Sequence, residues 1–144
     1  MSQENVEIVR RFFAVFETFA GRIEPDEVAD RLPDAALGEF FDPELEWVPI
    51  PQGLLAGSTY SGFDGFRGFV ADFIAAWDEI HAEPQEFVDR GDQVVVIFRV
   101  RGRMHELEID EVWSHLYTLR NGRIVRVQSF ASREGALEAA GLSE

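Results

Sequence analysis

Cysteine is missing from the sequence, and basic residues are scarce. The absence of cysteine excludes disulfides, thiolate nucleophiles and zinc sites with cysteine ligands. Lys and Arg together number 13 against 27 Asp and Glu, which gives a formal net charge of -14. A charge of this sign repels phosphate backbones and anionic lipids. We therefore expect neither nucleic acid nor a membrane surface as a partner.

Long apolar runs and clustered histidines are also lacking. No stretch approaches the roughly 18 apolar residues of a membrane span, and the first residues lack the basic and apolar regions of a secretory signal. These features favour a cytoplasmic protein. The 3 histidines, His81, His105 and His115, are dispersed along the chain, so we expect no metal site built on a histidine triad.

What the sequence does contain is typical of one globular domain, residues 1–144. Hydrophobic residues make up 46% and charged residues 28% of its 144 residues, and one domain is the usual organisation at this length. The aromatic residues are 13 Phe, 3 Trp and 2 Tyr. Most of the ring surface therefore has no polar group, which suits a dry core or an apolar pocket.

Helical periodicity dominates the first half of the chain. One amphipathic stripe predicts a first helix: Val6, Val9, Phe12, Phe13, Phe16 and Phe19. A stronger stripe from Phe66 to Trp77 predicts another helix that lies on a sheet. Between them we expect two short helices that end at Asp42-Pro43, a strand over 45–50, and a loop over 49–62 of the kind that often rims a site.

The second half has the pattern of consecutive strands. We predict strands over 85–89, 93–101, 107–119 and 124–131, joined by short turns, and a last helix over 133–140 that Ser132 caps. Short turns imply antiparallel pairing. Helices followed by an antiparallel run indicate the α+β class, with helices on one face of a strongly curved sheet. An apolar pocket opens wherever the helices do not fill the curve.

Three segments carry a resemblance to a known family. They are Gly62-Phe63-Asp64-Gly65-Phe66, the run from Gly91 to Val96, and above all His115-Leu116-Tyr117-Thr118-Leu119-Arg120-Asn121-Gly122-Arg123-Ile124-Val125-Arg126. In order and spacing they resemble the SnoaL-like group of the nuclear-transport-factor-2-like superfamily. That superfamily includes polyketide cyclases, ketosteroid isomerases, limonene epoxide hydrolases, dehydratases and proteins that only bind or associate.

The resemblance implies a cone-shaped, cystatin-like α+β barrel, with the curved sheet wrapped on the N-terminal helices. It also implies a homodimer without a cofactor that holds a small apolar molecule in the cone. In the SnoaL-like cyclases a His on the penultimate strand acts with an Asp on the last strand. The matching positions in this sequence are His115 and Ser129. A serine cannot supply the carboxyl base that proton abstraction next to a carbonyl requires, which puts cyclase chemistry in doubt.

His115 is the central candidate for catalysis, because imidazole is the side chain best suited to proton transfer near neutral pH. A buried histidine that serves packing alone is the competing interpretation. Glu111 is the second catalytic candidate. It lies four residues from His115, roughly 13 Å along a strand, which is too far for direct contact, and an exposed edge position is its alternative.

Seven residues are predicted to line the pocket: Trp47, Tyr60, Trp77, Trp113, Tyr117, Val127 and Ser129. Each could instead be core or rim. Whether Ser129 faces His115 depends on the Asn121-Gly122 turn. A two-residue turn pairs Ser114 with Ser129, whereas a three-residue loop with a glycine bulge pairs Trp113 with Ser129 and Val127 with His115. We predict the second register.

Three functions remain open at this stage. The first is an acid-base enzyme of isomerase, cyclase or hydratase type, with His115 as proton carrier and Glu111, Tyr60 or Ser129 as helper. The second is a module that binds a hydrophobic molecule without catalysis. The third is a structural dimer in which Phe side chains fill the cone.

Overall fold

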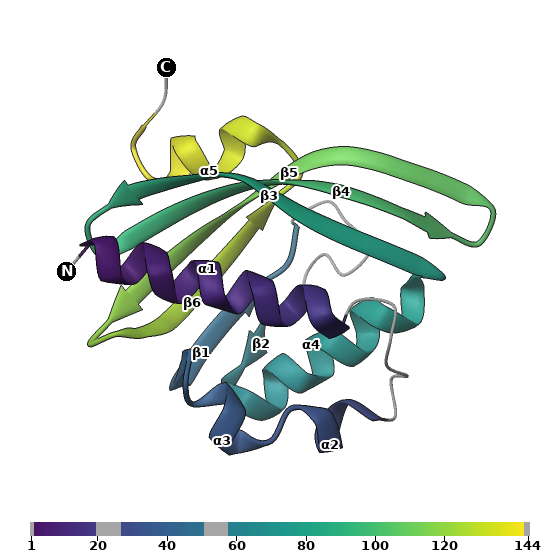
Figure 1. Ribbon diagram of the computed structural model, residues 1–144, viewed down its shortest axis with the longest axis horizontal. Coiled ribbons are helices and arrows are strands. Elements are labelled where there is room, and N and C mark those ends of the chain that lie inside the picture. The colour runs from purple at the N-terminus through teal and green to yellow at the C-terminus, as the bar shows by residue number, and fades with distance from the viewer. Residues whose placement is uncertain (1, 20–26, 51–57, 143–144) are drawn as a thin grey trace.

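A six-stranded sheet in the order β2-β1-β6-β5-β4-β3 is the centre of the fold. The computed structural model describes residues 2–19, 27–50 and 58–142. The strands are β1 (Phe41–Val48), β2 (Tyr60–Ser61), β3 (Glu79–Arg90), β4 (Gln93–Met104), β5 (Leu107–Arg120) and β6 (Arg123–Phe130). The sheet is strongly curved and does not close, so β2 and β3 form its two edges (Figure 1).

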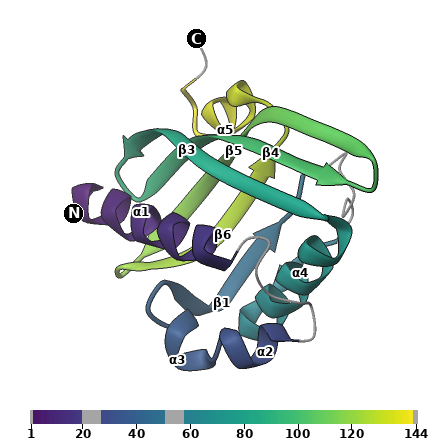
Figure 2. The same ribbon diagram turned by 45° about the vertical axis from the view of Figure 1, so that its right-hand side comes forward.

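Helices cover both faces of this sheet. They are α1 (Ser2–Phe19), α2 (Val28–Arg31), α3 (Asp34–Leu37), α4 (Gly62–Ala76) and α5 (Arg133–Ala139). Figures 1 and 2 show α1 lying across the concave face, α2, α3 and α4 grouped beyond it, and α5 on the opposite face. The predicted α+β class with a curved sheet on N-terminal helices is confirmed.

The apolar stripes of the two long helices form the core against the concave face. In α1, Val9, Phe12 and Phe13 are buried, and in α4 the buried residues are Phe66, Phe69 and Val70. They pack against inward side chains of β1, β4, β5 and β6 in one continuous hydrophobic cluster. Removing this much apolar surface from water is the main stabilising term of the fold.

The sheet differs from the prediction in being mixed. β1 runs parallel to β6, while the other neighbouring strands are antiparallel. Short turns identify only strand pairs that follow one another in the sequence. β1 and β6 are instead separated by residues 49–122, and parallel strands always need a long connection. The sequence pattern therefore had no local signal for this pairing.

Two predicted boundaries were wrong in the segment before the sheet. The short helices end at Leu37, and β1 begins at Phe41 rather than after Pro43. Pro43 is tolerated in the strand because the β1–β6 ladder is interrupted between Phe41 and Glu46, where a missing N–H costs no ladder bond. Of the predicted loop 49–62, residues 51–57 lie outside the described residues, and Tyr60-Ser61 pairs with β1.

Two strands of the meander are longer than predicted. β3 begins at Glu79 instead of 85 and β4 continues to Met104 instead of 101, while β5 begins at Leu107 as predicted. The expected break at 102–106 shrinks to a two-residue turn, in which His105 has a φ of 60°. Gly102 belongs to β4 rather than to a loop. A glycine is needed at this position because a Cβ would lie 2.9 Å from a Trp77 ring carbon.

The last helix is fixed to the convex face by two serines. The Ser132 hydroxyl accepts the Gly135 N–H at 3.1 Å, which confirms it as the cap of α5. The Ser114 hydroxyl donates to the Ser132 carbonyl at 2.6 Å and accepts the Ala136 N–H at 3.1 Å. Ser114 is fully buried, and these bonds satisfy its polar atom.

Candidate functional site

Ser129 lies directly opposite His115 on neighbouring strands. The β5–β6 ladder pairs His115 with Ser129 and Tyr117 with Val127. Both registers considered from the sequence were therefore wrong, including the predicted pairing of Trp113 with Ser129 and Val127 with His115. The expectation that Val127 and Ser129 share the face of His115 and Tyr117 is correct, because all four belong to facing pairs on the concave side.

A bulge explains the difference in register. Arg120 pairs with Arg123 around Asn121 and Gly122, whose φ angles of 54° and 78° fit the two-residue type I′ turn. The register then shifts between Thr118 and Leu119, which leaves Val125 as the extra residue on β6. The bulge lets Ile124 and Val127 both be buried, although strict alternation would place them on opposite faces.

Trp47 completes the floor of the concave face. It pairs with Val127 in the parallel β1–β6 ladder, so Trp47, Val127 and Tyr117 form one row across three strands, with exposures of 1%, 0% and 0%. His115 and Ser129 form the next row. The ring centroids of Trp47 and His115 are 5.6 Å apart, with an interplanar angle of 83°. The structure thus brings five of the predicted site residues together.

Aromatic rings surround His115 on the remaining sides. The Phe98 centroid lies 4.6 Å from that of His115, and the Phe13 centroid lies 6.0 Å away. Phe13 comes from α1 and Phe98 from β4, so helix and sheet both contribute to this enclosure. Sequence analysis had assigned these phenylalanines to secondary structure only. The α1 stripe was the available signal, since a helix on the concave face must point its apolar side at the site.

His115 and Tyr117 form a hydrogen-bonded pair. His115 Nδ1 lies 2.9 Å from the Tyr117 hydroxyl oxygen, and the tautomer of the imidazole decides which of them donates. Desolvation lowers the pKa of His115 to about 3 and raises that of Tyr117 well above its usual 10. Both side chains are therefore uncharged at neutral pH. With the serine hydroxyl of Ser129, the polar centre of the cone carries no charge.

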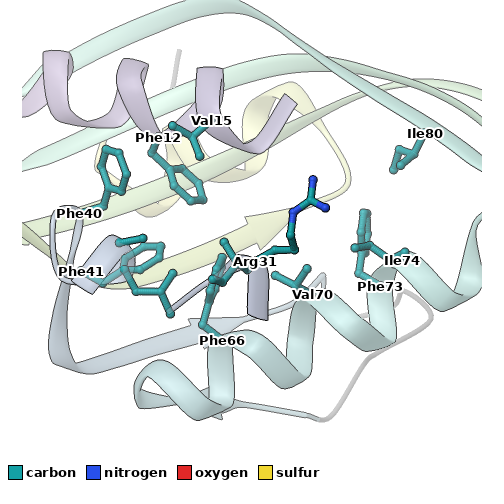
Figure 3. Close-up of a pocket in the computed structure, with 13 residues that line it drawn as sticks. Phe12, Val15, Arg31, Phe40, Phe41, Phe66, Val70, Phe73, Ile74 and Ile80 are labelled. Atoms are coloured by element: carbon teal, nitrogen blue, oxygen red, sulfur yellow. The ribbon is translucent and has the colours of Figure 1, made fainter. Parts of the chain in front are cut away.

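An apolar cavity of about 90 Å³ lies beside this centre, between α1, α2, α3 and α4. Its described lining is Phe12, Val15, Arg31, Leu32, Ala36, Leu37, Phe40, Phe41, Phe66, Val70, Phe73, Ile74 and Ile80. Of these, Arg31 alone is polar, and it is exposed. Figure 3 shows Phe12 entering from α1 and Phe66 from α4, on opposite sides of the cavity.

Phe12 and Phe66 separate the cavity from the polar centre. Both rings line the cavity, and both contact Trp47, with centroid distances of 6.1 Å and 5.2 Å. Phe12 also lies 6.1 Å from the Tyr117 ring. The two phenylalanines therefore form a partition, one side of which faces the cavity and the other the polar floor.

The remaining predicted residues lie outside this group. The Glu111 carboxylate accepts the Trp113 indole N–H at 2.7 Å, and Glu111 is exposed. Trp113 and Trp77 are half-buried, and their ring centroids are 6.5 Å apart. Phe98 contacts both rings, 6.3 Å from that of Trp113 and 4.6 Å from that of His115. Glu111 and the two tryptophans therefore lie at the rim of the group.

Tyr60 points to the outer side of α4 rather than to His115. Its ring packs on Phe69 with a centroid distance of 5.5 Å, and its hydroxyl donates to Asp72 Oδ2 at 3.0 Å. Desolvation, reinforced by the Asp72 carboxylate, raises the pKa of Tyr60. A tyrosine held in this way is a weaker proton donor than an unperturbed one.

Neither a metal cluster nor a membrane span is evident in the part of the chain that the structure describes. There, no three metal-ligating side chains gather in one place, and the helices are too short or too polar to cross a bilayer.

Comparison with known proteins gives one family and many similar structures. The sequence profile of the SnoaL-like domain matches residues 9–127, while the curated proteins include no match. TerC, co-crystallised with polyporic acid, is 22% identical with a TM-score of 0.69 and covers 96% of this chain and 98% of its own. A candidate SnoaL-like polyketide cyclase from Jannaschia sp. CCS1 is 19% identical, with a TM-score of 0.65 and coverages of 89% and 85%.

A third similar structure is an NTF2-like protein of unknown function from Burkholderia pseudomallei K96243. It is 21% identical with a TM-score of 0.68, and the alignment covers 94% of this chain and 95% of that one. Identities in this range establish a shared fold and leave the activity open.

Proposed function

The chain belongs to the SnoaL-like domain family, as its motifs predicted, and we propose that it binds a small, uncharged, largely apolar molecule inside its cone. The observation that carries this proposal is the uncharged polar centre of His115, Tyr117 and Ser129 beside an apolar cavity. Burying a charged group without a partner is costly. A ligand that reaches this floor must therefore be neutral, with few polar atoms.

The size of the cavity sets the scale of the ligand. Its volume of about 90 Å³ equals roughly three water volumes, well below the 300 Å³ or more of a pocket for a drug-sized molecule. A cavity of about 150 Å³ can hold benzene, so a single ring is the upper limit, and any larger ligand would have to displace the Phe12 or Phe66 ring. TerC, co-crystallised with polyporic acid, supports small-molecule binding in the same fold.

A pair of alanines in α3 provides a test. Ala36 lines the cavity, whereas Ala35 is exposed and does not line it. Neutral one-ring aromatic compounds should raise the melting temperature of the wild type and of Ala35→Leu by mass action. Ala36→Leu, which places a larger side chain in the cavity, should lose that increase. Equal stabilisation of all three proteins would refute binding in this cavity.

A cofactor-independent acid-base enzyme is the second candidate, favoured by the hydrogen bond between His115 and Tyr117. A proton taken up at the imidazole of His115 would be stabilised by the Tyr117 oxygen, 2.9 Å away. Ser129, opposite His115, could orient a substrate oxygen but is no carboxyl base. Isomerase, cyclase or hydratase chemistry would thus use His115 as proton carrier. A His115→Ala variant that bound substrate and kept full turnover would eliminate this candidate.

Glu111 and Tyr60 contribute less to this second proposal than the sequence suggested. Glu111 is exposed and bonded to the Trp113 indole, and Tyr60 donates to Asp72. Both are bonded to other groups, so Tyr117 replaces them as the group paired with His115.

The partners and location predicted from the sequence complete the proposal. We expect a homodimer in the cytoplasm, without a cofactor and without nucleic acid or membrane partners. Light scattering during gel filtration should give twice the mass of the chain, and a monomer mass would refute the dimer.

A further inference from the structure

Trp47 carries a buried hydrogen-bond donor that nothing in the described structure satisfies. The residue is 1% exposed, and its Nε1 is the one buried side-chain nitrogen or oxygen without a partner among the described residues. An indole N–H can only donate. Leaving such a group unpaired in the interior is unfavourable, so an unpaired donor at this depth requires an explanation.

None of the rings that pack around Trp47 accepts a hydrogen bond from its indole N–H. Its neighbours are Phe12, Phe41, Phe66, Phe69 and His115, at centroid distances of 6.1, 6.4, 5.2, 4.9 and 5.6 Å. Four of these are phenylalanines without polar atoms. The fifth ring is His115, whose Nδ1 is bonded to the Tyr117 hydroxyl. The indole N–H of Trp47 makes no bond to this imidazole.

The partition described above lies between the cavity and Trp47. Phe12 and Phe66 each contact Trp47 on one side and the cavity on the other, and Figure 3 shows them projecting from different helices. A ring that fills the cavity and displaces either phenylalanine would bring a substituent to the indole N–H. The cavity would then hold the apolar part of the ligand, and Trp47, which packs behind the two phenylalanines, would supply the hydrogen-bond donor.

Resting on the proposed function, we propose that Trp47 Nε1–H is the donor that anchors the ligand, and that the ligand is a neutral aromatic compound with a carbonyl-type oxygen. A ketone, aldehyde, quinone or ester oxygen accepts such a bond without bringing a charge. A carboxylate would need a buried cation, and the four phenylalanine rings that pack on Trp47 provide none. Trp47 is thereby a specificity-determining residue.

Two probes of nearly equal shape test this assignment. Acetophenone and α-methylstyrene share the ring and the methyl group and differ in C=O against C=CH₂. The protein has 3 tryptophans, hence three indole N–H signals in a ¹⁵N-labelled sample. Trp77→Phe and Trp113→Phe assign two of them and serve as matched controls at the rim. Assignment by elimination works even if Trp47→Phe does not fold.

Acetophenone should move the Trp47 indole proton downfield, and α-methylstyrene should not. Net hydrogen-bond energies correspond to about a fivefold to tenfold change in affinity. Trp47→Phe should therefore weaken acetophenone binding by that factor more than α-methylstyrene binding, whereas the two rim variants should weaken both probes alike. Comparing the two losses removes the packing effect common to both probes.

The outcomes separate this inference from the proposed function. If α-methylstyrene shifts the methyl signals of Leu37 and Val70 in the cavity but acetophenone leaves the Trp47 N–H unmoved, the anchor is refuted and apolar binding stands. The same conclusion follows if Trp47→Phe weakens both probes equally, as it would were the donor permanently bonded to an internal water. If neither probe shifts those methyl signals, both proposals fail.

Discussion

His115 Nδ1 lies 2.9 Å from the hydroxyl of Tyr117, two residues further along the same strand. Side chains at i and i+2 share a face of a strand, so β5 alone creates this pair, and the elements on the concave face bury Tyr117 and half-bury His115. Burial keeps the imidazole and the phenol uncharged at neutral pH. The properties of the site thus follow from the strand that holds it and from the aromatic rings that cover it.

Tyr117→Phe should destabilise the protein by about 1 kcal/mol, because it removes the partner of a buried imidazole nitrogen. It should also change the ¹⁵N shifts of the His115 ring, since the bond to Tyr117 selects the tautomer. Tyr60→Phe is the matched control, as it removes the other tyrosine hydroxyl from its bond to exposed Asp72. Identical His115 shifts in wild type and Tyr117→Phe would contradict the pairing.

His115 should make the fold less stable in acid. Its pKa is about 3 in the folded protein against about 6.5 when unfolded, so the unfolded chain binds more protons in between. The contribution of neutral His115 to the free energy of unfolding is fully present above pH 6.5. It decreases as the pH falls from 6.5 toward 3, by at most about 1.4 kcal/mol per pH unit.

Urea unfolding of wild type and His115→Gln between pH 4 and 7 measures that contribution as a difference. The stability of the variant should fall less on acidification. His105→Asn, which removes a histidine from the exposed β4–β5 turn, should follow the wild type. Parallel curves for wild type and His115→Gln would show that the folded protein tolerates a charged His115.

Phe66→Ala should open the partition between the cavity and Trp47. A buried Phe→Ala change costs about 3–5 kcal/mol, and part of that loss should be recovered when benzene occupies the enlarged space. Phe63→Ala, half-buried on the same helix and outside the cavity lining, is the control. Melting temperatures with and without benzene measure both effects, and equal benzene responses of the two variants would argue against the partition.

Glu111→Gln should leave stability within about 0.5 kcal/mol of wild type, as for most surface changes, because the amide oxygen can still accept the Trp113 N–H. It should also leave the binding of neutral aromatic compounds unchanged. Denaturant unfolding and ligand titration measure the two properties. A tenfold loss of binding would show that Glu111 belongs to the ligand site despite its exposed position.

The long elements were predictable because their signals are local. The α1 and α4 stripes and the strand runs of the meander specify their own periodicity. Asn121-Gly122 by itself favours the two-residue turn that the structure contains, and the longer loop that we predicted was wrong. β1 was harder, since its partner β6 is remote in sequence and Pro43 resembles a breaker. The pairing of His115 with Ser129 depended on a bulge at Val125, a single extra residue that changes every facing pair behind it.

The site residues on the strands could be predicted from the sequence, and those on the helices that cover them could not. Trp47, His115, Tyr117, Val127 and Ser129 were chosen from the alternation of strands and the family resemblance, and they do lie together. Phe12, Phe13 and Phe66 were missed as site residues, because a helical stripe shows that a side chain is buried but not what it is buried against. The unsatisfied Trp47 N–H has no sequence signature at all.

A cone with an uncharged polar centre should accept neutral molecules in preference to charged ones. Acetophenone, which is neutral, and benzoate, which is an anion of similar size, should be titrated at pH 7 while the methyl signals of Leu37 and Val70 are followed by NMR. We expect saturable shifts with acetophenone and none with benzoate at the same concentrations. Shifts with benzoate as large as those with acetophenone, or no shift with either compound, would contradict this expectation.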